Sequence, residues 1–341
     1  MKILVYYQPP IKSNGIEGIR LRKSIKGALE SHKIPYTTNV SDDYDVAHFI
    51  SINDEREIEI VKERNIPIVF SALYTESDPK ASLLEYKNKD GVKIIELKPK
   101  ALKILNKVDL VTVPTKENAE FLANAGVTTK TIVAPMGNNL ARFDQSRDDE
   151  KELFFRYYAL DSRKPLVLAF GEYGRHIEGL NCLVAAATRC PNANFFFVGP
   201  REGRKKISLS AQKEIKEAPS NLKCVDMMPE DIYRSGLMNA KIVVAPSYKP
   251  ISITIIMDAM AAKCQIIARN SAVFKDILED GVTAYFGKFS ETITSLIVDC
   301  LENRQQPTII EAYNTISKLD LSVFGTTLIN QYRKLNYNKT K

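Results

Sequence analysis

The strongest constraint on the fold comes from residues 240–269, where two apolar runs flank an apolar helical segment. Ile242–Ala245 and Gln265–Ala268 have the length and composition of buried strands, and a Pro-Ser turn and a polar loop precede the helix. Strands joined through a helix lie parallel in one sheet. The segment therefore predicts two parallel strands of one sheet, connected by an apolar helix.

The same alternation of strands and helices runs through both halves of the chain, on either side of a polar stretch at Arg147–Lys164. This pattern predicts an α/β fold with two Rossmann-like, doubly wound domains and a ligand cleft between the carboxyl ends of their strands. The expected strands are Ile3–Tyr7, Val46–Ile50, Ile66–Phe70, Leu110–Val113 and Thr131–Ala134, followed by Leu166–Phe170, Asn194–Val198, Leu222–Val225, Ile242–Ala245, Gln265–Ala268 and one near Ala284–Phe286.

Composition limits the classes of protein that the chain can belong to. Its 341 residues, 44% hydrophobic and 26% charged, suit two soluble domains. It has no run of about 18 apolar residues, and the N-terminal apolar run is too short for a signal peptide, so we expect a cytoplasmic protein. Five cysteines without a CxxC motif favour reduced thiols, and three scattered histidines argue against a histidine metal site.

Basic residues gather in two segments of the first half, although the net charge is only +7. One is the helix expected at Ile19–His32, and the other is Pro99–Lys107. Two interpretations stand, which are contact with an anionic membrane surface and an ordinary solvated helix face. Nucleic acid is not an expected partner, because no aromatic residues are interleaved with the basic runs. The candidate membrane-binding residues are Arg20, Arg22, Lys23, Lys26, Lys98, Lys100, Lys103 and Lys107.

Several segments carry a resemblance to a known family. Val108–Val127 has a strand, a Pro-Thr pair and a helix, Ala134–Phe143 reads APMGNNLARF, and residues 240–269 follow the order given above. Together they resemble the retaining glycosyltransferases of family 4, which have the two-domain GT-B fold. Within that family the chain is most similar to bacterial diglycosyl-diacylglycerol synthases. The segments that carry this closer resemblance are Ile34–Asn39, Tyr44–Phe49, Gly126–Thr131 and Ile266–Ile277.

The resemblance implies an arrangement of domains. It places an acceptor and membrane domain at residues 1–155 and a nucleotide-sugar domain at 156–320. The last helix, expected at Val323–Tyr337 within residues 321–341, then returns to the first domain.

The resemblance also implies a donor site. Glycines after the first strand of each domain let the backbone approach the donor phosphates, basic side chains neutralise them, and Asp258 binds ribose hydroxyls. For some of these residues a structural role stays open: a salt bridge for Asp258, N-capping for Ser252 and Thr254, and a simple turn for the first glycine pair. The expected donor-binding residues are Gly15, Gly18, Gly171, Arg175, Lys249, Ser252, Thr254 and Asp258.

Four positions depart from the family pattern. Glu172 and Glu178 stand where the family has the basic pair that faces the donor diphosphate, and a carboxylate there repels it. Pro250 replaces the first of two acidic residues, and Ser71 follows a strand after which the family often has a catalytic-site histidine.

The function that the resemblance implies is transfer of a hexose, glucose from UDP-glucose, to a membrane glycolipid such as monoglucosyl-diacylglycerol, with retention. The catalytic residues are unknown, no cofactor is expected to be tightly bound, and Mg²⁺ is expected at most as an aid to activity. The expected location is the cytoplasmic face of the membrane, as a peripheral protein. The alternatives are a non-catalytic relative that binds a glycan, a lipid or a partner glycosyltransferase, and a nucleotide-sugar epimerase of similar fold.

Overall fold

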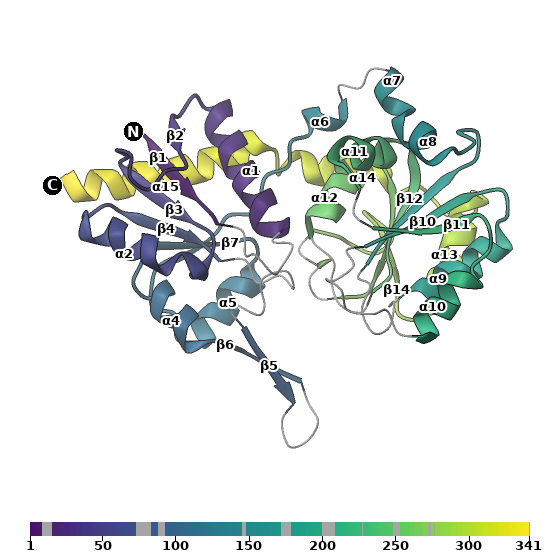
Figure 1. Cartoon of the computed structure of the whole chain (residues 1–341), viewed down its shortest axis with the longest axis horizontal. Coiled ribbons are helices and arrows are strands. Elements are labelled where there is room, and N and C mark those ends of the chain that lie inside the picture. The colour runs from purple at the N-terminus through teal and green to yellow at the C-terminus, as the bar shows by residue number, and fades with distance from the viewer. Residues whose placement is uncertain are drawn as a thin grey trace. The chain divides into compact units, whose positions relative to one another are not determined.

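The computed structural model describes residues 1–8, 16–72, 83–87, 93–144, 148–171, 179–199, 209–226, 228–247, 253–271, 274–275 and 277–340. The chain divides into two compact units, Met1–Asn139 with Leu319–Lys341 and Leu140–Lys318. Each unit contains one six-stranded sheet whose strands are all parallel (Figure 1). The predicted fold of two doubly wound α/β domains is confirmed.

The first unit has the strand order β2-β1-β3-β4-β7-β8. The expected strands lie within two residues of their observed limits. An antiparallel pair, β5 and β6, is absent from the prediction, which has only a helix between β4 and β7. The elements of this unit are β1 (Ile3–Tyr6), α1 (Ile16–Ser31), β2 (Tyr36–Thr37), β3 (Val46–Phe49), the 3-10 helix η1 (Ile52–Asp54), α2 (Glu55–Glu63), β4 (Ile68–Ser71), β5 (Leu83–Lys87), β6 (Lys93–Leu97), α4 (Pro99–Leu105), β7 (Leu110–Val113), α5 (Lys116–Asn124), β8 (Thr131–Val133) and α15 (Leu321–Thr340).

Helices cover both faces of the first sheet, because successive side chains of a strand point to opposite faces. Ile3 and Val5 of β1 pack with α1 and α15 on one face. Leu4 packs on the other face, in a cluster that includes apolar residues of α2, α4 and α5. The final helix α15 therefore forms part of the first unit's core, and its Tyr332 is fully buried there.

A chain of four buried polar side chains crosses the first unit from α15 to β7. His48 Nδ1 lies 2.5 Å from Tyr332 Oη, and His48 Nε2 lies 2.6 Å from Ser71 Oγ. Ser71 Oγ lies 2.6 Å from Thr112 Oγ1 on the neighbouring strand. A neutral imidazole donates through one nitrogen and accepts through the other, so it satisfies both neighbours. Burial lowers the pKa of His48 from 6.5 to about 3.

The two crossings of the chain between the units are held together by backbone hydrogen bonds. Asn138 N donates to Leu319 O at 2.9 Å, and Leu321 N donates to Asn138 O at 3.1 Å. Asn138 thus pairs with the short stretch that leads into α15. The end of the first unit's main segment and the start of its returning helix are therefore fixed to one another.

The second unit has the strand order β11-β10-β9-β12-β13-β14. Its first strand, β9, lies next to β12, and the order reverses between these two strands. In open α/β sheets, ligands bind at the carboxyl ends of strands where the order reverses. The elements of this unit are α6 (Ala141–Asp144), α7 (Asp148–Lys151), α8 (Leu153–Tyr158), β9 (Leu166–Phe170), α9 (Leu180–Arg189), β10 (Asn194–Val198), α10 (Leu209–Lys216), β11 (Leu222–Val225), α11 (Glu230–Asn239), β12 (Ala240–Ala245), α12 (Ile253–Ala261), β13 (Gln265–Arg269), β14 (Tyr285–Gly287), α13 (Ser290–Leu301) and α14 (Ile309–Ser317).

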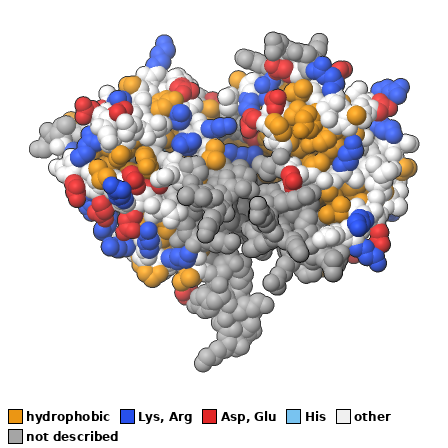
Figure 2. All heavy atoms as spheres, in the orientation of Figure 1, with side chains coloured by type: hydrophobic (Ala, Val, Ile, Leu, Met, Phe, Trp, Pro, Cys, Tyr) orange, Lys and Arg blue, Asp and Glu red, His pale blue; other side chains and the backbone are white. Residues whose placement is uncertain are grey.

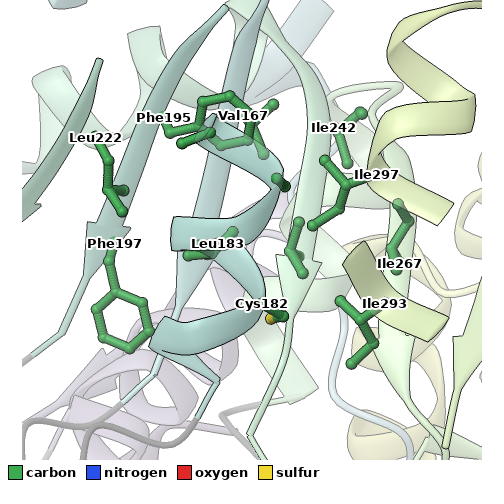
Figure 3. Close-up of a cluster of buried hydrophobic side chains, with 14 of the residues drawn as sticks. Val167, Cys182, Leu183, Phe195, Phe197, Leu222, Ile242, Ile267, Ile293 and Ile297 are labelled. Atoms are coloured by element: carbon green, nitrogen blue, oxygen red, sulfur yellow. The ribbon is translucent and has the colours of Figure 1, made fainter. Parts of the chain in front are cut away.

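The core of the second unit is an apolar layer between the sheet and helices α9 and α13 (Figure 3). Leu183 of α9 packs toward Phe195 and Phe197 of β10, and Ile297 of α13 packs near Ile242 of β12. All of these side chains are fully buried. The strands are apolar on both faces, which is typical of a parallel sheet covered on both sides.

The boundary between the units differs from the one expected near residue 155. Helices α6, α7 and α8 belong to the second unit. Phe154 of α8 is fully buried and packs against Phe196 of β10 with a ring separation of 5.0 Å. Ser235 Oγ of α11 accepts a hydrogen bond from the Phe154 backbone N–H. The charge-rich stretch at residues 147–164 therefore contributes two core aromatic residues, Phe154 and Phe155, to the second unit.

The depressed pKa of His48 predicts that the protein loses stability in mild acid. The unfolded chain takes up a proton at His48 near pH 6.5, whereas the folded chain does so only near pH 3. Stability is therefore fully present above pH 6.5 and falls as the pH drops toward 3. Between pH 6.5 and 5 this one group should lower the free energy of unfolding by about 2 kcal/mol.

Urea unfolding of the wild type and of His48→Gln at pH 7 and pH 5 measures this pH-dependent change in the free energy of unfolding. We expect a smaller loss of stability in His48→Gln than in the wild type. His32→Gln, which changes a partly exposed histidine on α1, is the control and should keep the wild-type pH dependence. An identical pH dependence in all three proteins would show that His48 is not held neutral.

Candidate active site

The segment at residues 240–269 forms the predicted strand, helix and strand. Strand β12 ends at Ala245, helix α12 begins at Ile253, and β13 pairs in parallel with β12. All nine residues of α12 are buried, including Thr254 in its first turn and Asp258 one turn later. A helix buried on every side places a carboxylate where few water molecules can reach it.

Asp258 obtains its polar partners from two other helices. Tyr233 Oη of α11 donates a hydrogen bond to Asp258 Oδ2 at 2.9 Å. Arg142 Nη1 of α6 lies 3.7 Å from the same oxygen. Arg142 also pairs with Glu230 at the start of α11. Burial of a carboxylate without such partners costs several kcal/mol, so these contacts offset the cost of placing the Asp258 carboxylate in α12.

Tyr233 also connects Asp258 with the end of β9. Its ring packs edge-on against Phe170, with ring centroids 5.9 Å apart. Phe170 is the last residue of β9 and directly precedes Gly171. One tyrosine therefore touches both the helix that carries Asp258 and the strand that leads into a predicted phosphate-binding glycine.

Gly171 lies where the sheet order reverses, in close contact with the end of β12. A Cβ atom at this position would lie 2.6 Å from Phe197 Cζ and 3.1 Å from Ser247 Oγ. Gly179 has φ of +85°, and a Cβ there would lie 2.5 Å from Pro246 Cβ. Side chains are thus excluded at both positions, and the chain at Gly171 and Gly179 lies close to Ser247 and Pro246.

Arg269 fixes the same end of β12 from the opposite side. Its Nε and Nη2 donate to Pro246 O at 3.0 and 2.9 Å, and its Nη1 donates to Lys288 O at 2.9 Å. The residue is only 2% exposed. A buried positive charge therefore lies at the carboxyl edge of the sheet, beside the strand ends that hold Gly171 and Ser247.

The structure brings together some of the predicted donor residues. Gly171, Thr254 and Asp258 all belong to the second unit. Gly171 directly follows Phe170, which contacts the Tyr233 ring, and the Tyr233 hydroxyl binds Asp258. Gly18 is in the first unit, where a Cβ atom would overlap the Tyr7 ring at 2.2 Å, so internal packing already requires glycine there. The predicted residues Gly15, Arg175, Lys249 and Ser252, and the departures Glu172, Glu178 and Pro250, lie outside the described residues.

Three residues of this region are absent from the sequence prediction: Arg142, Tyr233 and Arg269. Arg269 gives a signal in the sequence, because it ends an otherwise apolar strand. Arg142 and Tyr233 give none, since they lie 116 and 25 residues from Asp258 in the chain. Ser71 is also placed by the structure, in the buried hydrogen-bonded chain with His48 and Thr112.

In α1, two of the candidate membrane-binding residues have partners within the first unit. Arg22 donates to Tyr7 O at 3.1 Å, and Lys26 lies over the Tyr36 ring at 5.0 Å. Lys23 is exposed on the same helix. Two basic side chains of α1, Arg22 and Lys26, therefore contact other residues of the first unit, whereas Lys23 is exposed.

In and after α4, two more candidates form ion pairs with α2. Lys100 pairs with Glu55 at 3.0 Å, and Lys107 pairs with Glu59 at 2.5 Å. Lys103 is exposed, while Ala101, Ile104 and Leu105 are buried. On the face drawn in Figure 2, basic and acidic side chains of the first unit are interspersed. In the part of the chain that the structure describes, no helix is long and apolar enough to cross a membrane.

Comparison with known proteins identifies the second unit. The sequence profile of the family described as "Glycosyl transferases group 1" matches residues 150–316. The chain carries a glycosyl transferases group 1 domain. The match ends two residues before the second unit does, so it includes β9, α11 and α12 with the hydrogen bond from Tyr233 to Asp258, whereas Arg142 of α6 lies before its first residue.

One curated relative resembles the chain over nearly its full length. The processive diacylglycerol alpha-glucosyltransferase of Acholeplasma laidlawii is 22% identical over 344 residues, which cover 98% of each chain. The resemblance therefore includes the first unit as well as the glycosyl transferases group 1 domain.

Solved structures show the same fold. HepE of Anabaena, determined in complex with UDP-glucose, has a TM-score of 0.71 at 15% identity and covers 98% of this chain and 100% of its own. A glycosyltransferase from Rickettsia africae has a TM-score of 0.66 at 16% identity and covers 98% of each chain. With two parallel sheets already observed, these likenesses show the GT-B fold expected from the sequence.

Within the residues that the structure covers, no three His, Cys, Asp or Glu side chains are grouped so that they could hold a metal ion.

The contacts of Arg269 predict its contribution to stability. Arg269→Met removes the donors of two backbone carbonyl groups, and each unsatisfied buried acceptor costs about 1–3 kcal/mol, so we expect a loss of about 2–4 kcal/mol in the free energy of unfolding. Urea unfolding measures it. Arg163→Met, at a side chain that is 89% exposed, is the control and should change stability by less than about 0.5 kcal/mol. Equal effects of both substitutions would contradict the role assigned to Arg269.

Proposed function

We propose that the protein is a retaining hexosyltransferase that moves glucose from UDP-glucose to a membrane glycolipid such as monoglucosyl-diacylglycerol. The observation that carries the proposal is the placement of Asp258. It is a buried carboxylate on α12 of a glycosyl transferases group 1 domain, joined through Tyr233 to the strand end at which the sheet order reverses. A carboxylate at such a site can accept hydrogen bonds from the ribose hydroxyls of a nucleotide.

Two comparisons support the choice of donor and acceptor. HepE was determined with UDP-glucose, and its fold matches this chain along nearly its whole length. The Acholeplasma laidlawii relative is named for glucosyl transfer to diacylglycerol, and it too matches along nearly the whole chain. A nucleotide-sugar donor and a glycolipid acceptor are therefore the partners we propose, with the protein bound peripherally to the cytoplasmic face of the membrane.

The proposed chemistry requires stabilisation of the departing diphosphate. Backbone N–H groups at the start of α12 and near Gly171 are the proposed donors to the phosphates, because preorganised amides at a helix N-terminus favour developing negative charge. We propose Arg175 and Lys249 as the cations that offset Glu172 and Glu178. Gly15, Gly18, Ser252 and Thr254 remain proposed donor-site residues.

A second candidate function is a non-catalytic relative that binds a glycan, a lipid or a partner glycosyltransferase. The observation in its favour is the pair of glutamates, Glu172 and Glu178, at positions where the family has basic residues. Transfer of radiolabelled glucose from UDP-glucose to monoglucosyl-diacylglycerol in mixed micelles separates the two candidates. The proposal predicts a labelled diglucosyl lipid whose new anomeric configuration matches that of the donor. Binding of UDP-glucose without transfer would favour the non-catalytic candidate.

The role of Asp258 predicts a specific kinetic defect. Asp258→Asn keeps the shape of the side chain but removes its charge, and hydrogen bonds to charged groups contribute about 1.5–3 kcal/mol, so the donor KM should rise roughly tenfold to a hundredfold. Steady-state kinetics at saturating acceptor measure the change. Asp231→Asn, at an exposed position on α11, is the control and should leave the donor KM unchanged. A donor KM equal to that of the wild type in Asp258→Asn would remove Asp258 from the donor site.

Membrane attachment predicts a charge effect on lipid binding that depends on two exposed lysines. Lys23 and Lys103 are exposed. Arg22, Lys26 and Lys107 contact partners within the unit, and Lys100, which is also exposed, pairs with Glu55. Each lysine near an anionic surface contributes about 1 kcal/mol, so Lys23→Glu with Lys103→Glu should weaken binding to phosphatidylglycerol vesicles by at least about tenfold.

Vesicle sedimentation measures this effect, and molar salt should weaken wild-type binding as well, because the Debye length then falls to about 3 Å. The matched control is Lys164→Glu with Lys275→Glu, two exposed lysines of the second unit with the same change in net charge. Equal weakening by both double substitutions would show a general charge effect and no specific contact through α1 and α4.

A further inference from the structure

We propose that Tyr233 and Arg142 are positioning residues that hold the Asp258 carboxylate in the orientation that binds the donor ribose. The inference rests on the proposed function, because it deepens the role of the same donor site. It adds to that site two residues from α11 and α6, neither of which belongs to the strand, helix and strand that carry Asp258.

Both residues act on one oxygen atom of the carboxylate. Tyr233 Oη lies 2.9 Å from Asp258 Oδ2, and Arg142 Nη1 lies 3.7 Å from it. The terminal torsion of an aspartate is broad, so a carboxylate does not choose one orientation by itself. A hydrogen bond and a positive charge on the same oxygen select one orientation and set the direction in which the other oxygen points.

Tyr233 is itself held in place by the sheet. Its ring packs against Phe170 at 5.9 Å and under the Arg142 guanidinium, which lies 5.8 Å from the ring centroid. Only 6% of the residue is exposed. The position of its hydroxyl therefore follows the end of β9, which directly precedes the proposed phosphate-binding residue Gly171. One rigid side chain thus sets the Asp258 carboxylate relative to the end of this strand.

Arg142 has a second partner, but the contact with Asp258 is the better shielded of the two. The Glu230 side chain is 61% exposed, so its pair with Arg142 is screened by water. The Asp258 side chain is only 10% exposed, and Arg142 is 24% exposed. Coulomb interactions strengthen as water is removed, so Arg142 acts chiefly on Asp258. Arg142 also follows the paired crossing at Asn138 by four residues, so the segment that enters the second unit carries this cation.

A structural role alone is the competing explanation, since the three side chains also join α6, α11 and α12. The two explanations differ in the relative affinity that the variants should have for ligands with and without ribose hydroxyls. A positioning role predicts that Tyr233→Phe and Arg142→Met reduce the preference for a ligand with ribose hydroxyls over one without them. A purely structural role predicts equal losses for both ligands.

Isothermal titration calorimetry with UDP and with 2′,3′-dideoxy-UDP tests the inference. The wild type should bind UDP roughly tenfold to a hundredfold more tightly than the dideoxy ligand, and Asp258→Asn should abolish most of this preference. Tyr233→Phe and Arg142→Met should each reduce it by a factor of about 3 to 10. Arg142→Lys, which keeps the charge, replaces Arg142→Met if the latter does not fold.

Two matched controls are available in the same unit. Arg234→Met removes an arginine of similar exposure, 25%, that pairs with Glu150. Tyr157→Phe removes a hydroxyl from a tyrosine that is 58% exposed. Both should keep the wild-type preference between the two ligands.

The outcomes separate failure of the inference from failure of the proposed function. If the wild type does not bind UDP, the proposed donor is wrong and the inference falls with it. If Asp258→Asn abolishes the preference while Tyr233→Phe and both Arg142 variants keep it, the donor site stands and the positioning role is overturned. Loss of affinity for both ligands by the same factor in Tyr233→Phe also overturns it.

Discussion

A carboxylate buried in an apolar helix must receive its polar partners from elsewhere in the fold, and this requirement organises the second unit. Asp258 receives a hydroxyl from α11 and a guanidinium from α6. Helix α12 itself is buried along all nine residues. Two neighbouring helices thus supply the polar partners of Asp258, and Tyr233 connects this carboxylate with Phe170 at the strand end where a ligand is expected.

The same end of the sheet is fixed at several other points. Arg269 holds the carbonyl oxygen of Pro246, and Gly171 and Gly179 let the chain pass close to Pro246 and Ser247. The first unit contains a comparable hydrogen-bond network, in which His48 of β3 contacts Tyr332 of α15 and Ser71 of β4. In both units a buried polar network, and not only apolar packing, sets the positions of the strand ends.

The strands could be predicted closely from the sequence, because a parallel strand covered on both faces is a continuous apolar run between turn residues. Leu110–Val113 and Asn194–Val198 have the predicted limits. The pair β5–β6 could not be found in this way, since its two short strands lie outside the parallel sheets and carry no such run. Residues 147–164 were expected only as a polar stretch between the two halves, because their charged residues obscure the buried Phe154 and Phe155 of α8.

The candidate site was predictable only in part. Asp258 and Gly171 follow local patterns, a helix and a strand end. Arg142 and Tyr233 depend on contacts between distant segments, which no local pattern shows. The basic residues of α1 and α4 illustrate the same limit, because the sequence shows the charge of Lys100 and Lys107 but not their pairing with Glu55 and Glu59.

The central claim is that the Asp258 carboxylate, held by Tyr233 and Arg142, faces the ribose of a nucleotide donor. A crystal structure of the protein with UDP tests it most directly. The account predicts a ribose hydroxyl within hydrogen-bond distance of an Asp258 carboxylate oxygen, with the bond from Tyr233 to Asp258 retained. A nucleotide bound away from α12, or a ribose contacted only by other side chains, would contradict it.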